Sequence, residues 1–143
     1  MKFTMIIDKE RDEEVIVYAR ERSPLTDDIE RLVSGERFEL IGYNGKKAVR
    51  LEPSQVYCFT VEDNKVYAVC EGERLQLKCR LYQLEQALCE GFVKINQSCI
   101  ANIKKISRFD ASISGSLKVV FKNGYCDYVS RRQVKNVKER LGL

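Results

Sequence analysis

Apolar and polar residues alternate in short runs over most of the chain, and turn residues separate these runs, as is typical of successive β-hairpins. Residues 38–43 and 46–51 flank Asn44 and Gly45, a pair that predicts a type I′ turn between two strands. Further strands are predicted at residues 56–61, 65–70, 74–80, 92–95, 106–114, 117–122 and 125–129, with a second Asn-Gly turn at 123–124. The pattern therefore predicts a body built mainly from β-strands.

Three stretches instead repeat apolar residues every three or four positions, which predicts helices. The first covers residues 24–34 after the N-cap Ser23, and the second is a short helix at residues 80–90. The third starts at residue 130, where Ser130 and Gln133 form a capping-box pattern. Pro24 is predicted at the first helical position of the first helix, and Gly35 and Gly91 are predicted to end the first and second helices. The apolar stripes of the three helices are, in order, Leu25, Ile29, Leu32 and Val33; Leu81, Leu84 and Leu88; and Val134, Val137 and Leu141.

The N-terminal part of the chain is predicted to form a small β-β-α segment. Residues 2–8 and 15–20 alternate like two strands of a hairpin and precede the first helix. We expect an accessory segment at residues 1–43 and a main domain at residues 44–143, so the fold class is mainly β with short helices (α+β). The accessory segment is either a scaffold that packs on the main domain or a dimerisation or partner-binding unit.

Composition narrows the class of protein. Apolar residues make up 44% of the chain and charged residues 32%, as in soluble globular domains. The sequence shows neither an apolar run of about 18 residues nor a signal peptide, so we expect a cytoplasmic protein. Histidine is absent, and no phosphate loop, nucleophile elbow or close carboxylate pair stands out, so we expect neither an enzyme nor a cofactor.

Six cysteines are spaced irregularly, without a CxxC pair, at positions 58, 70, 79, 89, 99 and 126. Because there is no histidine, a zinc site would need four cysteines from scattered strands, and we expect no metal. Most of these thiols are predicted to be small buried apolar groups. A redox-sensing pair is the alternative.

Charge is divided between the two ends of the chain. The net charge is +4, but residues 1–40 carry −4 and residues 41–143 carry +8. A basic body is suited to binding a polyanion.

Two stretches are candidates for this binding. In residues 92–106, a polar elbow of Asn96, Gln97 and Ser98 interrupts the apolar positions, and Asn or Gln can bond adenine through two hydrogen bonds. The elbow is also compatible with an ordinary turn. Arg131 and Arg132 are predicted in the first turn of the last helix, where positive charge is unfavourable, which indicates a functional role. The alternative is a solvated helix end whose arginine stems cover apolar neighbours.

Together these features resemble the LytTR-type DNA-binding domain, the output module of many bacterial response regulators. The resemblance covers residues 44–143. It rests on Phe92, Lys94, Ser98, Asn102, Ile103, Ile106, the Asn123-Gly124 turn, Ser130 and Arg132.

The resemblance implies a stack of small β-sheets without a helix-turn-helix, in which three loops enter successive major grooves of double-stranded DNA. Where the family often has histidine in the first and second loops, this chain has Asn64 and Asn96. We expect Arg132 to contact guanine and Gln97 or Asn96 to contact adenine. The loop residues are Asp63, Asn64 and Lys65, then Asn96, Gln97 and Ser98, then Arg131 and Arg132; the expected phosphate contacts are Lys65, Lys94, Lys104, Lys105 and Lys135.

Because only residues 1–43 precede the DNA-binding part, we expect no phosphorylatable receiver domain, and the chain resembles stand-alone LytTR regulators. Some of these are restrained by a small membrane protein, which makes such a partner an expectation from the resemblance. We expect a homodimer on two half-sites and no small-molecule substrate.

Two rival hypotheses stay open. In the first, the acidic front end binds a regulatory protein and the basic surface is incidental. In the second, aromatic residues such as Tyr57, Tyr67 and Tyr125 bind single-stranded nucleic acid. The second is disfavoured because these residues alternate like core positions and no RNP-type motif is present.

Overall fold

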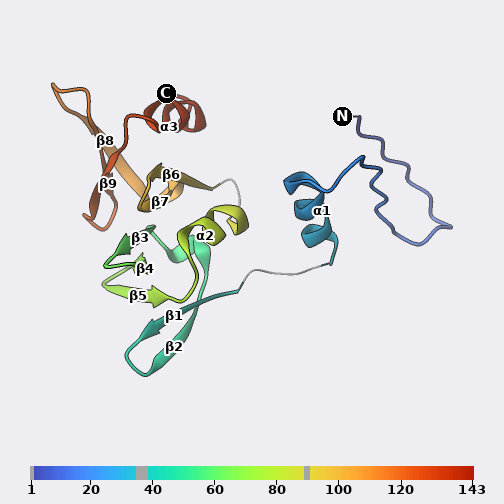
Figure 1. Ribbon diagram of the computed structural model, residues 1–143, viewed down its shortest axis with the longest axis horizontal. Coiled ribbons are helices and arrows are strands. Elements are labelled where there is room, and N and C mark those ends of the chain that lie inside the picture. The colour runs from blue at the N-terminus through green and yellow to red at the C-terminus, as the bar shows by residue number, and fades with distance from the viewer. Residues whose placement is uncertain (1, 35–38, 89–90) are drawn as a thin grey trace. The chain divides into compact units, whose positions relative to one another are not determined.

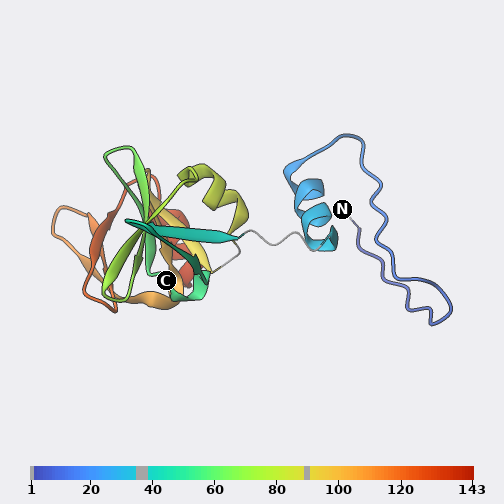
Figure 2. The ribbon, with the colours of Figure 1, turned by 90° about the horizontal axis from the view of Figure 1, so that it is seen from below.

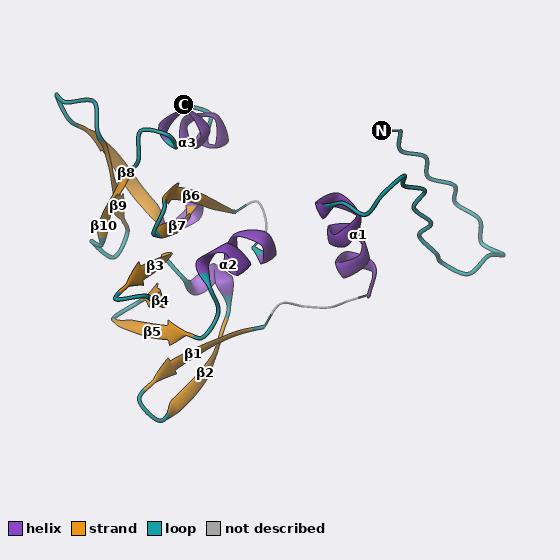
Figure 3. Cartoon of the chain, in the orientation of Figure 1, coloured by secondary structure: helices purple, strands orange, loops and turns teal. Residues whose placement is uncertain are grey.

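The computed structural model describes residues 2–34, 39–88 and 91–143. The chain divides into two compact units, Met1–Phe38 and Glu39–Leu143, which are described separately. Figures 1 and 2 show the ribbon from two directions, and Figure 3 distinguishes helices from strands.

Within residues 2–34, the first unit contains one helix, α1 (Pro24–Ser34), at the predicted position. Ser23 caps it: the Thr26 amide donates to Ser23 Oγ over 3.3 Å, and the Ser23 amide donates to Thr26 Oγ1 over 2.9 Å. The predicted hairpin is wrong, because the structure has no strand within residues 2–22, and these side chains are exposed. An isolated two-stranded hairpin is marginal in water, and one short helix buries too little of it to change this. Gly35, the predicted helix end, lies outside the described residues.

The second unit is a chain of hairpins with two helices, which confirms the predicted fold class. Its elements are β1 (Leu40–Asn44), β2 (Lys47–Leu51), η1 (Pro53–Gln55), β3 (Cys58–Glu62), β4 (Lys65–Cys70), β5 (Glu73–Leu77), α2 (Leu81–Ala87), β6 (Phe92–Asn96), β7 (Cys99–Asn102), η2 (Ile103–Lys105), β8 (Ile106–Ala111), β9 (Leu117–Phe121), β10 (Cys126–Val129) and α3 (Val134–Leu141). The strands form a seven-stranded sheet of order β2-β1-β5-β4-β3-β7-β6 and a three-stranded sheet of order β10-β9-β8. All pairings are antiparallel. Because Tyr43 of β1 pairs with Gln76 of β5, this unit begins before residue 44.

The seven-stranded sheet is covered on both faces. One face places Cys58, Val93 and Cys99 in a core with residues of the second sheet and α3, among them Phe121 and Val137. The other face forms a second core. It contains Leu40, Val56, Phe59, Val66, Ala68, Leu77 and Ile100, together with Leu81 and Leu84 of α2. Neighbouring positions on β3 and β7 thus point to different cores, as the period of a strand requires.

Two adjacent hairpins use different turns. In the β1–β2 hairpin, Asn44 pairs with Lys47, so the loop is Gly45 and Lys46. Only Gly45 of these two has a positive φ, 59°, which excludes the predicted type I′ turn and fits the glycine-first pattern of type II′. In the β3–β4 hairpin, Asp63 and Asn64 have φ of 51° and 61°, as a type I′ turn needs at both central positions.

The ends of the later helices differ from the prediction. Helix α2 ends at Ala87 with Leu88 as an extended C-cap, so Gly91 does not close it. Helix α3 begins at Val134, and its N-cap residue Gln133 makes no side-chain capping bond, so the predicted capping box is not formed. The amides of Gln133 and Val134 both donate to the Ser130 carbonyl instead. The backbone turn therefore replaces the side-chain cap.

Asn102 is one of the two buried polar residues described in the core and joins separate segments of the second unit. Its Nδ2 donates to the Val56 carbonyl over 2.9 Å, and its Oδ1 accepts from the Lys104 amide over 3.2 Å. We expect Asn102→Ala to lower the free energy of unfolding by about 1–3 kcal/mol, because both partners lose their hydrogen bonds. Urea unfolding measures this, with the exposed Asn136→Ala as control. An equal effect of the two substitutions would contradict the prediction.

Candidate nucleic-acid interface

Three loops of the second unit lie at the same end of its strands. We name them tip 1 (residues 63–64, between β3 and β4), tip 2 (residues 97–98, between β6 and β7) and tip 3 (residues 131–132, between β10 and α3). Tip 2 is tied to the strand leading into tip 1, since the Val61 amide donates to the Ser98 carbonyl over 2.8 Å. Tip 3 is tied to β6, because the Ser130 amide donates to the Ile95 carbonyl over 2.8 Å. The three tips therefore share one edge of the fold.

Asn96 holds tip 2 and tip 3 together. Its Nδ2 donates to Asp127 Oδ1 over 3.1 Å and to the Tyr128 carbonyl over 2.8 Å, at the end of β10. Its Oδ1 accepts from the Ser98 amide over 2.8 Å. An Asn side chain has two N–H donors, and both are engaged within the protein. Gln97, by contrast, is exposed at the tip.

Tip 1 is a tight, exposed turn on a braced hairpin. Asp and Asn are among the residue types that most readily adopt positive φ, which explains how a turn without glycine can form at Asp63 and Asn64. At the base, Arg74 of β5 forms an ion pair of 2.6 Å with Glu62 and lies 4.7 Å from the centre of the Tyr67 ring. Lys65 is exposed beside the turn.

Tip 3 presents unneutralised positive charge. Arg131 and Arg132 are exposed in the turn before α3, and among the described residues neither makes an ion pair. Lys135 follows in the first turn of α3 and is also exposed. The arginines thus precede the helix, whereas we predicted them in its first turn.

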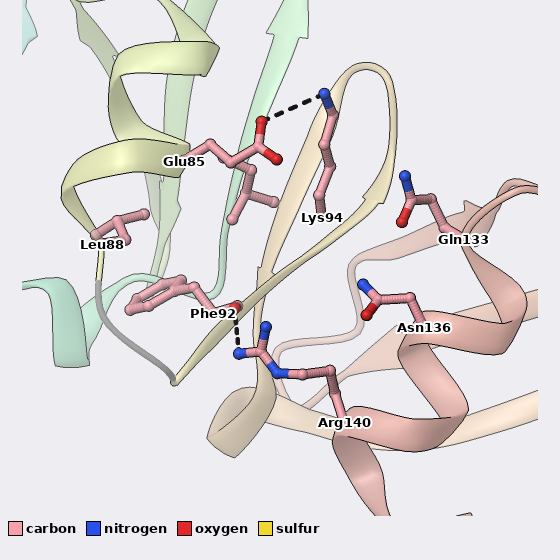
Figure 4. A pocket seen from close by; sticks show the side chains of 8 residues that line it. Glu85, Leu88, Phe92, Lys94, Gln133, Asn136 and Arg140 are labelled. Carbon is pink, nitrogen blue, oxygen red and sulfur yellow. Dashed lines mark hydrogen bonds and ion pairs between the residues drawn. The ribbon is translucent and has the colours of Figure 1, made fainter. Parts of the chain in front are cut away.

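Three predicted phosphate contacts lie elsewhere. Lys94 is half-buried, and its Nζ lies 3.5 Å from Glu85 Oε2 of α2, as Figure 4 shows. Lys104 and Lys105 belong to η2, at the opposite end of β7 from tip 2. Lys105 Nζ lies over the ring of Tyr57, 5.1 Å from its centre, and Tyr57 directly precedes β3. A strand of four residues separates these lysines from tip 2 by roughly 10 Å or more.

Comparison with known proteins identifies this architecture. The model of the LytTr DNA-binding domain family matches residues 46–142. The chain belongs to the LytTR family. It is 34% identical over 104 residues to uncharacterized HTH-type transcriptional regulators of Staphylococcus aureus strains NCTC 8325 / PS 47 and COL, a match covering 73% of this chain and 71% of each relative. A solved LytTr DNA-binding domain from Bacillus cereus shares the fold with a TM-score of 0.71, at 19% identity, over 76% of this chain and 100% of that one.

The LytTR domain of this chain is not built as its relatives' names suggest. Those names say HTH-type, but in the described part of this chain α2 and α3 are separated by the strands β6 to β10. No two helices of the second unit are consecutive there, so the described residues contain no helix-turn-helix. The candidate interface consists of loops.

Asp127 is a residue of the candidate interface that the sequence did not suggest. Its carboxylate accepts from Asn96 Nδ2 and from the Tyr128 amide, so it helps to fix the approach to tip 3. The only local sequence signal for Asp127 is that it is an acidic residue next to a basic stretch. Its partner Asn96 lies 31 positions earlier, and nothing in the local pattern links the two.

The described cysteines differ in exposure. Cys58 and Cys99 are buried, Cys70 and Cys79 are half-buried, and Cys126 is exposed; Cys89 lies outside the described residues. Burial raises the pKa of the Cys70 and Cys79 thiols, and a hydrogen bond with Cys58 together with burial raises that of Cys99. These thiols stay protonated at neutral pH, and the protonated form is the less reactive one.

Neither a metal cluster nor a membrane-spanning helix is found in the part of the chain that the structure describes. In the described ranges, no cluster of three or more His, Cys, Asp or Glu side chains is arranged to hold a metal ion. The helices of the described chain are too short or too polar to cross a membrane.

The turn at tip 1 allows its backbone and its side chain to be tested separately. We expect Asn64→Gly to preserve folding, because Gly adopts positive φ without strain. Asn64→Val should lower the free energy of unfolding by about 1–2 kcal/mol, since a β-branched residue is disfavoured there. Urea unfolding of both variants checks this. Equal stability of the Val and Gly variants would show that the turn relaxes.

Proposed function

We propose that this chain is a transcription regulator that binds double-stranded DNA sequence-specifically, with tips 1, 2 and 3 in the major groove. The observation that carries the proposal is the set of hydrogen bonds that ties the three tips into one edge. Loops fixed in this way present their side chains without a large loss of conformational entropy on binding. The family membership supports DNA as the ligand.

Each tip has its own proposed role. Arg132 can donate two hydrogen bonds to guanine O6 and N7, and Gln97 can bond adenine N6 and N7. Asn64 supplies an amide of the same chemistry at tip 1. Asn96 positions tip 2, since its amide donors bond Asp127 and Tyr128.

Phosphate contacts are proposed for the lysines beside the tips, Lys65 and Lys135. Such contacts set affinity and its salt dependence and carry little sequence information. We propose that Lys104 and Lys105, at the far end of β7, lie outside the interface. A regulator of bacterial genes would work in the cytoplasm, and we propose no catalytic activity for it.

Selection from a pool of random duplexes tests this function. We expect the purified protein to enrich one motif, with affinity falling steeply as salt rises. Arg132→Ala should weaken binding to that motif by about 1–3 kcal/mol and relax the preference at one base pair, whereas Lys104→Ala should leave affinity unchanged.

Two results would count against the proposal. Selection without any enriched motif at low salt would reject a sequence-specific duplex reader. An equal loss on selected and random duplexes for Arg132→Ala would remove its base-reading role. Competition with single-stranded DNA separates duplex binding from single-strand binding.

We further propose a homodimer formed through the first unit. Large apolar side chains of this unit are exposed to solvent: Phe3 is 82% exposed, Ile7 is 86% exposed and Tyr18 is 93% exposed. A unit this small cannot bury a core alone, and oligomerisation is a common solution. In a pair of chains, the exposed apolar side chains of the two first units would cover one another. Two copies on one face of DNA require half-sites spaced by whole helical turns of roughly 10.5 base pairs.

The oligomeric state tests this assignment. We expect sedimentation to give a dimer of the 16.6 kDa chain and Ile7→Asp to give a monomer, because a charge placed in a buried apolar interface is costly. Ile113→Asp is the matched control, since Ile113 is fully exposed in the second unit. A dimer that survives Ile7→Asp would place the contact elsewhere. A monomeric wild type would favour the rival hypothesis, in which the acidic front end binds a different protein such as a regulatory membrane protein.

A further inference from the structure

The segment that connects β5 with α2, residues 78–80, leaves the sheet at the end where the three tips lie (Figure 1). Val66 pairs with Leu77, so Lys65 and Lys78 are the next residues on β4 and β5 in the direction of tip 1. Because β5 is next to β4 in the sheet, the segment lies beyond tip 1 on the side away from tip 2. The DNA contacts proposed for the tips do not include it.

The backbone of this segment is held in place. The side chain of Cys79 packs against the core under α2. The Arg80 amide donates to Gln83 Oε1 over 2.8 Å, and the Arg80 carbonyl accepts from the amides of Gln83 and Leu84 over 3.1 and 3.3 Å. Lys78 and Arg80, which flank Cys79 in the sequence, have exposed side chains. The segment thus presents two cations from a fixed backbone.

Lys78 is positioned by an aromatic ring and not by a carboxylate. Its Nζ lies 4.4 Å from the centre of the Tyr43 ring on β1. Tyr43 pairs with Gln76 of β5, which places the ring on the same face of the sheet as Lys78. An aromatic ring attracts an ammonium group through its quadrupole but carries no net charge. The positive charge of Lys78 therefore remains available to an anion.

The carboxylate opposite Lys65 does not neutralise these cations. Glu62 is the cross-strand partner of Lys65, but it pairs with Arg74 over 2.6 Å. Lys65 and Lys78 are thus neighbouring like charges on one face of the sheet, an arrangement that is destabilising without a counter-charge. A local rule broken in this way indicates a functional site, and here the missing group is an anion.

Three unpaired cations meet one unpaired carboxylate beyond tip 1. Among the described residues at this end of β4 and β5, the cations without an ion pair are Lys65, Lys78 and Arg80, and the unpaired carboxylate is that of Asp63. A surface with this excess of positive charge attracts a polyanion.

The spacing of the strands fits the backbone of a duplex. Neighbouring strands lie about 4.8 Å apart, so β5 lies roughly 7 Å from the middle of the hairpin that carries tip 1. One base pair advances the axis of the double helix by about 3.4 Å. The segment is therefore displaced from tip 1 by about two base pairs.

We propose that residues 78–80 form a fourth DNA contact, in which Lys78 and Arg80 bind backbone phosphates about two base pairs beyond the bases that tip 1 meets. Such contacts extend the footprint and fix the orientation of the domain, but they do not read the sequence. The fourth contact rests on the proposed function for double-stranded DNA as the ligand. It does not depend on sequence specificity.

Affinity measured against salt concentration tests the contact. We expect Lys78→Gln to weaken binding about fivefold at low salt, equally for selected and random duplexes, and to reduce the slope of log K against log salt by about one. Lys78→Arg keeps the charge and should bind like the wild type. Lys46→Gln is the matched control, because Lys46 is exposed in the β1–β2 turn at the opposite end of the sheet, and it should also bind like the wild type.

Ethylation of single phosphates in a selected duplex locates the contact, because it removes the charge of the phosphate. We expect the wild type to lose affinity at one or two ethylated phosphates at which Lys78→Gln is insensitive. These phosphates should lie outside the base pairs of the selected motif.

Four results would overturn the fourth contact. These are an unchanged affinity in Lys78→Gln, an equal loss in Lys78→Arg, a loss confined to the selected duplex, and an ethylation profile that Lys78→Gln does not alter. If selection yields no motif, the sequence-specific function fails, and the salt dependence on random duplexes still decides the role of Lys78. If a motif is selected and Lys78→Gln binds it like the wild type, the fourth contact fails and the proposed function stands.

Discussion

The fold of the second unit depends on burying both faces of its central strands. On β3, Cys58 points to the core shared with the second sheet, and its neighbour Phe59 points to the core under α2. Full burial of a large apolar side chain such as Phe59 contributes about 1.5–3 kcal/mol. The same short strands supply buried side chains to both cores. A displacement of β3 or β7 would therefore disturb both cores at once. This constraint makes the sheet a stiff base.

The stiff base explains how short polar loops can form a binding edge. Tips 1 and 2 are each two residues long, and tip 2 is anchored to the buried strand pair by the bond between Val61 and Ser98. Asn96 then extends the anchoring to β10 through Asp127 and Tyr128. Loops held in this way lose little conformational freedom on binding, which supports the base contacts that we propose for them.

The two units face different physical problems. Glu39–Leu143 buries its apolar residues within itself, whereas Met1–Phe38 leaves side chains such as Phe3, Ile7 and Tyr18 in solvent. The acidic balance of residues 1–40 opposes contact with DNA, and the basic balance of the remainder favours it. A division between assembly and DNA binding is consistent with both observations.

Local patterns determined much of this protein from the sequence alone. Alternation and turn residues correctly predicted the hairpins of the second unit, and helical spacing predicted α1, α2 and α3, because these signals act between neighbours in the chain. Tertiary structure decided the rest. It placed Arg131 and Arg132 in a turn before α3, in which the Ser130 carbonyl accepts hydrogen bonds from the amides of Gln133 and Val134. It placed Lys104 and Lys105 at the far end of β7 from tip 2, and it brought Asn96 into hydrogen-bond contact with Asp127. A contact between residues 31 positions apart depends on how two sheets pack, and no local pattern records that packing.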